Sequence, residues 1–120
     1  MAHILLNVTR GMEDIERASL AFVVGNTALS SGQEATVLFT NEGVRVAAEG
    51  CVDEDMQANG FQPLCGLMRN FLANGGQVWV CGACANPRTI IQDDLVEGAQ
   101  IVGAATAVEA LVNGAQSLSF

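Results

Sequence analysis

Five short runs of apolar residues recur along the chain, each about as long as a β-strand. They occupy residues 4–8, 35–39, 78–81, 100–102 and 117–120, and the segments between them carry apolar residues at steps of three and four. The short runs are typical of strands, and the stepped segments are typical of amphipathic helices. Because strands that alternate with helices usually pair in parallel, the pattern predicts an α/β fold with a mainly parallel five-stranded sheet.

The segment between the first two runs predicts a helix that is apolar on nearly all sides. Its stepped positions are Ile15, Ala18, Phe22, Gly25 and Leu29, and Leu20 and Val24 extend the apolar surface around the helix. A helix in a single layer over a sheet needs only one apolar face. We therefore expect a second subunit to cover part of this helix.

The middle of the chain contains signals for two further helices. Asn41 is expected to cap a short helix that reaches residue 48 and is closed by Gly50, because an asparagine side chain can accept an otherwise unpaired backbone N–H. The acidic segment 51–60 then predicts a solvated loop. Pro63 suits the first turn of the next helix, since proline fixes the backbone angle that a helix start requires.

The last third of the chain predicts two more helices. A short helix is expected near residues 93–97, where two carboxylates would lie at its N-terminal end. The tetrapeptide Thr106-Ala107-Val108-Glu109 fits the capping-box pattern, which places the start of the final helix at Thr106. Gly114 is placed to end that helix.

Length and charge narrow the class of protein. The chain has 120 residues and a formal net charge of −8, with five arginines and no lysine. This balance excludes a protein that binds the nucleic-acid backbone, and the length indicates one domain over residues 1–120. The longest uncharged stretch is interrupted by Asn, Gly and Gln, and the first residues lack a basic leader. We expect neither a membrane span nor a secretory signal, and therefore a cytoplasmic protein.

The four cysteines are expected to be mostly free thiols in a reducing cytoplasm. A core of this size does not need a disulfide. For Cys51 and Cys65 we favour the role of small buried apolar residues, because Cys65 lies on the apolar side of a predicted helix.

The residues best suited to binding or catalysis lie at the carboxyl ends of the first three predicted strands. Arg10, Asn41 and Cys81 follow or end these strands, and binding groups in parallel sheets gather at that edge. Cys81 is the only strong nucleophile among them. A thiolate is needed for attack, and Arg10 or Arg88 would favour that form if either lay over the sulfur.

The spacing of Cys81 and Cys84 leaves several site types open. A Cys-x-x-Cys segment occurs in thioredoxin-like redox sites and in zinc sites. A thioredoxin-like site opens a helix directly, and Pro87 disfavours a helix at Asn86, so the sequence is less typical of such a site. Zinc would need two further ligands, and the sequence offers no second close pair, so no metal is expected. The single histidine, His3, is expected to be structural and to lie at the opposite edge of the sheet.

The whole chain resembles the DsrE/DsrF-like family of small sulfur-relay proteins. The most specific segment is 78–85, VWVCGACA, supported by TRGMED at 9–14, FTNEGV at 39–44, and DLVEGA at 94–99 with the Gly-Ala pair at 103–104. The resemblance implies a three-layer α/β/α sandwich that assembles as a homotrimer or homohexamer. It also implies that a cysteine at the position of Cys81 carries sulfur as a persulfide, with no cofactor.

The resemblance implies partners as well, namely sulfur donor and acceptor proteins or small thiols. Arg10 and Asn41 are then expected to border the substrate site, with Arg88 as a weaker candidate. Two alternatives remain open: a thiol-disulfide oxidoreductase that uses Cys81 and Cys84 as a dithiol, and a non-catalytic oligomeric or ligand-binding module in which the cysteines only pack.

Overall fold

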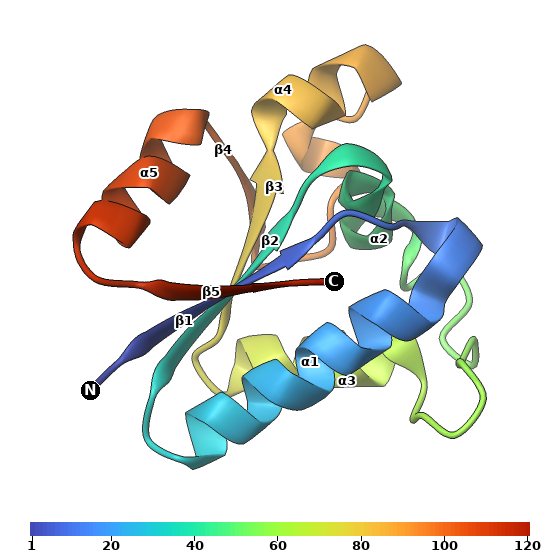
Figure 1. Cartoon of the computed structure of the whole chain (residues 1–120). Coiled ribbons are helices and arrows are strands. Elements are labelled where there is room, and N and C mark those ends of the chain that lie inside the picture. The colour runs from blue at the N-terminus through green and yellow to red at the C-terminus, as the bar shows by residue number, and fades with distance from the viewer.

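One parallel sheet organises the computed structural model, which describes residues 1–120 (Figure 1). Its strands are β1 (His3–Val8), β2 (Glu34–Phe39), β3 (Gln77–Cys81), β4 (Ala99–Val102) and β5 (Gln116–Ser119). The spatial order is β4-β3-β2-β1-β5, and all four pairings are parallel. Every predicted strand is present within one residue of its expected ends, and the α/β class is confirmed.

Helices cover both faces of the sheet, which confirms the three-layer arrangement. The helices α1 (Ile15–Ser30) and α3 (Leu64–Ala73) lie on one face, and α5 (Ala104–Val112) lies on the other (Figure 1). The chain progresses from β1 to β4 in one direction and then returns to the free side of β1 as β5. Because parallel crossovers are right-handed, this reversal places α5 opposite the earlier helices.

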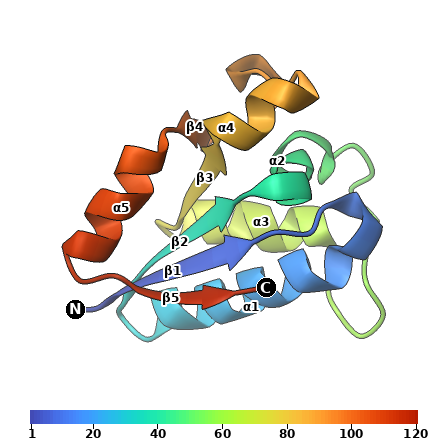
Figure 2. The same ribbon diagram turned by 45° about the horizontal axis from the view of Figure 1, so that its top comes forward.

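Two short helices lie beyond the carboxyl ends of the strands. In Figure 2, β2 leads into α2 (Val44–Glu49) and β3 leads into α4 (Gly82–Ala85). Single turns of 3-10 helix accompany them: η1 (Met12–Asp14), η2 (Asn41–Gly43), η3 (Asn86–Arg88) and η4 (Gln92–Asp94).

The larger hydrophobic cluster fills the space between the sheet and the α1 and α3 helices. Phe22 is its centre, with ring centroids 6.0 Å from Phe39 and 5.5 Å from Phe71, both edge-on. All three rings are fully buried. Edge-on aromatic pairs add to the stabilisation that burial alone supplies, so this triad ties both helices to the sheet.

The opposite face carries a much smaller cluster. Leu5, Leu38 and Val102 are buried there, with Trp79 and Ala107 packed against them. No residue of α5 is buried, and Val108, Leu111 and Val112 on this helix are 57%, 45% and 78% exposed. The α5 layer is therefore thin and keeps an apolar outer surface.

The apolar surface predicted around α1 is partly exposed. Phe22 and Gly25 are buried as expected, whereas Leu20 and Val23 are 41% and 40% exposed. The second subunit that was expected to cover this side stays a prediction.

Helix starts were predicted less well than helix cores. Asn41 does not cap a helix, because the 3-10 turn begins at Asn41 itself, whose φ is 53° and whose side chain makes no capping hydrogen bond. The last helix begins at Ala104 rather than Thr106, with Gly103 as its N-cap. The capping-box prediction was wrong because the preceding backbone already turns at Gly103.

The predictions for the other helix ends had mixed outcomes. Near residues 93–97 the chain forms only the 3-10 turn η4, closed by a hydrogen bond from the Ile91 N–H to the Asp94 carboxylate at 2.9 Å. Gly114 follows α5 with a φ of 104°, as its predicted terminating role requires. Pro63 is the N-cap of α3, one position before the first turn in which it was expected.

Cys51 and Cys65 form a disulfide, so the prediction that both are packing thiols was wrong. They are 14 positions apart in sequence, but their Cα atoms are 4.8 Å apart. The loop after α2 folds back, with the Leu64 N–H donating to the Met56 carbonyl at 3.0 Å. This return brings the start of α3 to the end of α2, a proximity that sequence spacing does not reveal.

None of the helices combines the length and the apolar character that a bilayer crossing requires.

Candidate functional site

Cys81 is the last residue of β3 and lies at the carboxyl edge of the sheet. It is paired with Val102 on β4. On the other side, Val80 is paired with Phe39 and Phe39 with Val8. The residues that follow β1 and β2 are therefore level with Cys81, and the three loops predicted to carry the site share one edge of the molecule.

The Cys81 side chain is half-buried and touches the rim of the larger hydrophobic cluster. Cys84 has the same intermediate exposure and also touches that cluster, and neither forms a disulfide. Cys81 as a residue is thus neither fully buried in the core nor fully exposed, and this position is compatible with a thiol that a small substrate can reach.

The segment after Cys81 is helical, which corrects the expectation of a loop. Cys81 is the N-cap of α4, and the turn continues through η3. Asn86, expected to avoid helix before Pro87, has φ −58° and ψ −50°. Pro87 is accommodated at the start of the 3-10 turn, where a proline needs no N–H partner. Cys81 therefore caps the helical turn that contains Cys84, which restores the thioredoxin-like alternative.

Arg88 fastens this helical turn to the neighbouring loop. Its Nε donates to Glu42 Oε1 at 2.7 Å, and its Nη1 donates to the carbonyl oxygen of Cys84 at 3.0 Å. Arg88 was a candidate for favouring the thiolate and a weaker candidate for bordering the substrate site. Its observed hydrogen bonds instead hold the backbone of the Cys-x-x-Cys segment in place.

Glu42 is a residue that sequence reasoning missed. Besides Arg88, it accepts a hydrogen bond from Arg45 Nε at Oε2, at 2.9 Å. The hydrogen bond from Arg88 is the largest cause that lowers the pKa of Glu42, and Arg45 lowers it further. The i, i+3 spacing of Glu42 and Arg45 was the only signal in the sequence, and the contact with Arg88 spans 46 residues.

Two glycines let the loops after β1 and β2 pack directly on one another. A Cβ atom at Gly43 would collide with the Val8 carbonyl, and one at Gly11 would collide with the Glu42 carbonyl. Gly11 also donates its N–H to Glu13 Oε1 at 2.6 Å. The loop that carries Arg10 is therefore held against the loop that carries Asn41 and Glu42.

Arg10 is exposed and differs from the other arginines in having no ion-pair partner. Arg17, Arg45, Arg69 and Arg88 each pair with a carboxylate. Arg10 follows β1, and β2 lies between it and the strand of Cys81. Two strand spacings amount to about 10 Å, so the backbone of Arg10 lies at the same edge as Cys81 but two strands away from it.

Asn41 follows β2, the direct neighbour of β3, and its side chain is exposed. Its left-handed backbone turns the chain out of the strand. The adjacent Thr40 hydroxyl donates to Asn7 Oδ1 at 2.9 Å, which fixes the end of β2. Asn41 is therefore placed at the expected edge, whereas its role toward a substrate is a prediction.

His3 lies at the opposite edge of the sheet, as expected. Its Nε2 is 2.8 Å from the Thr36 hydroxyl, which agrees with a structural role. No three His, Cys, Asp or Glu side chains come together in a group that could hold a metal ion. The chemistry available at the carboxyl edge is thus that of two thiols, one free guanidinium and backbone amides.

Comparison with known proteins gives one family over nearly the whole chain. The sequence model of the DsrE/DsrF-like family matches residues 2–120. Among curated proteins, the uncharacterized protein MJ0760 of Methanocaldococcus jannaschii is 31% identical over 98 residues, which are 82% of this chain but only 35% of that protein. The uncharacterized protein MJ0989 of the same organism is 31% identical over 72% of this chain and 71% of its own length.

Solved structures share the fold at low sequence identity. The protein of unknown function MTH1491 from Methanobacterium thermoautotrophicum superposes over 100% of both chains, with a TM-score of 0.78 and 16% identity. The ychN protein of Escherichia coli covers 100% of this chain and 99% of its own, with a TM-score of 0.75 and 13% identity. At these identities the likeness establishes the fold alone.

Proposed function

This chain belongs to the DsrE/DsrF-like family, a family of sulfur-relay type, and from that premise we propose that Cys81 carries sulfane sulfur as a persulfide. The observation that carries the proposal is the position of Cys81. It ends a central strand at the edge where binding groups of parallel sheets gather, and it is a free cysteine at a half-buried position.

The proposed reaction is a transfer of one sulfur atom between thiols. The Cys81 thiolate attacks the outer sulfur of a donor persulfide, R–S–SH, and R–S⁻ leaves as Cys81–S–SH forms. An acceptor thiolate then attacks the outer sulfur of that persulfide, and the Cys81 thiolate leaves. Each step forms one S–S bond and breaks one, so no further oxidant or reductant is consumed.

Arg10 and Asn41 are proposed to border the substrate. Arg10 is the arginine without a carboxylate partner, and Asn41 is exposed in the turn that follows β2, the strand next to that of Cys81. A guanidinium near a persulfide or thiolate favours the anionic form. Both residues would act on a substrate that spans the loops, since β2 separates Arg10 from the strand of Cys81.

A dithiol function of Cys81 and Cys84 is the second candidate, and the helical turn after Cys81 favours it. In this chemistry the Cys84 thiolate attacks the inner sulfur of Cys81–S–SH, forms a Cys81–Cys84 disulfide and releases HS⁻. A cycle would then need an external thiol to reduce the disulfide. The same two residues serve both candidates, so the fate of Cys84 separates them.

The proposed partners are sulfur donor and acceptor proteins or small thiols. We further propose a homo-oligomer, a trimer or a hexamer. Its support is the apolar surface left exposed by Leu20 and Val23 on α1 and by Val108 and Val112 on α5.

The Cys51–Cys65 disulfide weighs against a strongly reducing location, where such bonds are uncommon.

The test is sulfur uptake followed by intact mass. The protein is incubated with inorganic polysulfide, desalted and measured beside Cys81→Ala and Cys84→Ser. A relay function predicts the gain of one sulfur in the wild type and in Cys84→Ser, and no gain in Cys81→Ala. The dithiol function predicts an oxidised Cys81–Cys84 pair in the wild type, with sulfur retained only in Cys84→Ser. Equal gain in all three proteins would overturn both.

A further inference from the structure

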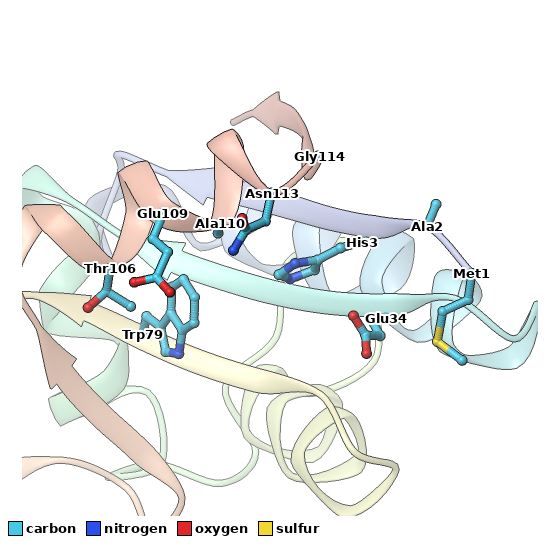
Figure 3. Close-up of a pocket in the computed structure, with 10 residues that line it drawn as sticks. All are labelled: Met1, Ala2, His3, Glu34, Trp79, Thr106, Glu109, Ala110, Asn113 and Gly114. Carbon is cyan, nitrogen blue, oxygen red and sulfur yellow. The ribbon is translucent and has the colours of Figure 1, made fainter.

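A hollow of about 480 Å³ lies between α5 and the amino-terminal half of the sheet. Figure 3 shows the side chains that line it. Thr106 and Glu109 come from α5 and Asn113 directly follows that helix. His3 and Glu34 come from the starts of β1 and β2, and Trp79 comes from β3. The volume falls in the range of pockets for small ligands.

The hollow is elongated along the strands and extends from the amino edge of the sheet to Trp79, two residues before Cys81 on β3. Glu34 is paired with His3 at the amino edge, whereas Trp79 is paired with Leu38, four residues further along β2. At 3.3 Å per residue these two levels are about 13 Å apart. Figure 3 shows Glu109 descending beside Trp79 at one end and Glu34 on the other side of His3.

The two charged side chains in the hollow are both negative, and the one positive group among its lining residues is the amino terminus of Met1. Glu34 and Glu109 line it, and none of the four ion pairs of the chain includes either carboxylate. No arginine contributes to the lining, and the chain has no lysine. A ligand for this hollow therefore brings positive charge rather than negative charge.

The end near Glu109 also offers an aromatic surface. Trp79 is half-buried, so part of its indole is accessible within the hollow. Tryptophan is the best aromatic partner for an ammonium group, and the attraction adds to that of a nearby carboxylate. Asn113 supplies an amide oxygen that can accept a hydrogen bond.

We propose that this hollow binds a linear aliphatic polyamine. One ammonium group lies between Glu109 and the face of Trp79, and another lies near Glu34. The methylene chain runs between them past His3, whose Nε2 is already engaged with the Thr36 hydroxyl. The site is independent of the sulfur chemistry, because it uses no residue of the carboxyl edge.

The chain supplies its own reporter for this site. Trp79 is the only tryptophan, and there is no tyrosine, so the fluorescence excited at the indole band comes from the hollow alone. Spermidine is titrated into the intact protein at constant ionic strength. Butylamine is the single-charge comparison, and 1,4-butanediol is the uncharged one. We expect a saturable change with spermidine, a weaker one with butylamine and none with the diol.

Charge-removing variants locate the bound ammonium groups. Glu109→Gln is expected to weaken both amines, and Glu34→Gln to weaken spermidine but not butylamine, each by about three- to fivefold, as for an exposed ion pair. Glu16→Gln, on the exposed surface of α1, is the matched control and should leave both affinities unchanged.

Three results would overturn the proposal: no saturable response to spermidine, an equal response to the diol, or equal weakening by Glu16→Gln. Equal weakening by Glu16→Gln would mean that spermidine binds only through the net charge of −8 and not at the hollow.

Discussion

The Nη1 of Arg88 donates a hydrogen bond to the carbonyl oxygen of Cys84 at 3.0 Å, while its Nε donates to Glu42. One side chain thus connects the backbone of the Cys-x-x-Cys turn to the loop after β2. A turn of four residues has little stability of its own. We infer that Arg88 is a positioning residue for the two thiols rather than a group that contacts substrate.

Removal of Arg88 tests this connection. Arg88→Ala should lower the melting temperature by a few degrees and speed amide hydrogen exchange at residues 82–88, because the turn loses its link to Glu42. Arg17→Ala is the matched control, since Arg17 pairs with Asp14 on the more exposed surface of η1 and α1. If hydrogen exchange at residues 82–88 is unchanged in Arg88→Ala, the turn is stable without the hydrogen bonds of Arg88.

The ion pairs of Glu42 predict a pH dependence of stability. The pKa of Glu42 is lowered from its ordinary value of 4.5, chiefly by the hydrogen bond from Arg88. A depressed folded-state pKa contributes stability above the ordinary value, and this contribution is lost as the pH falls from about 4.5 toward the folded-state pKa.

The urea midpoints of the wild type and of Glu42→Gln measure that contribution. The wild type should be more stable at pH 7, and the difference should shrink below about pH 4.5. If the difference in stability between the two proteins stays constant from neutral to acidic pH, the charge of Glu42 is not its cause, and the altered hydrogen-bond geometry is.

The contact between the loops after β1 and β2 predicts an intolerance of side chains. Gly43→Ala should destabilise the fold by about 1 to 3 kcal/mol, because the new methyl group meets the Val8 carbonyl and the backbone must shift. Gly66→Ala on α3 is the control. No atom lies within 4 Å of its Cβ position, so that variant should gain about 0.5 to 1 kcal/mol from helix propensity. Chemical denaturation compares the two, and equal effects would contradict the proposed close approach.

The disulfide predicts a clear loss of stability on reduction. Closing a loop of this length contributes about 3 kcal/mol in the chain-entropy account, or about 10 °C in melting temperature for a domain of this size. Dithiothreitol should lower the melting temperature of the wild type and of Cys84→Ser. It should leave the double variant Cys51→Ser/Cys65→Ser unchanged. Four alkylatable thiols in the untreated protein would rule out the bond.

The sheet could be predicted from sequence because local patterns specify it. Each strand is a short apolar run, and Val78 and Val80 are buried in the larger cluster as their alternation with Trp79 requires. The placement of Cys81 at the carboxyl edge followed from the end of one such run, without any knowledge of contacts.

Features that join distant segments could not be predicted in this way. The Cys51–Cys65 bond depends on a loop that folds back, and the link from Arg88 to Glu42 crosses from one loop to another. The turn after Cys81 was misjudged for a related reason. Local rules disfavour helix before Pro87, but the hydrogen bond from Arg88 to Cys84 supports the turn from outside that tetrapeptide.

Localising the sulfur atom tests the central claim most directly. The protein is loaded with polysulfide, freed of excess reagent, alkylated, digested without reductant and mapped by peptide mass spectrometry. The account predicts one additional sulfur on the alkylated peptide that contains Cys81, and its disappearance when a small thiol acceptor is added before alkylation. Additional sulfur located at Cys84 in the Cys81→Ala variant, or sulfur on Cys81 that no thiol can remove, would contradict a relay through Cys81.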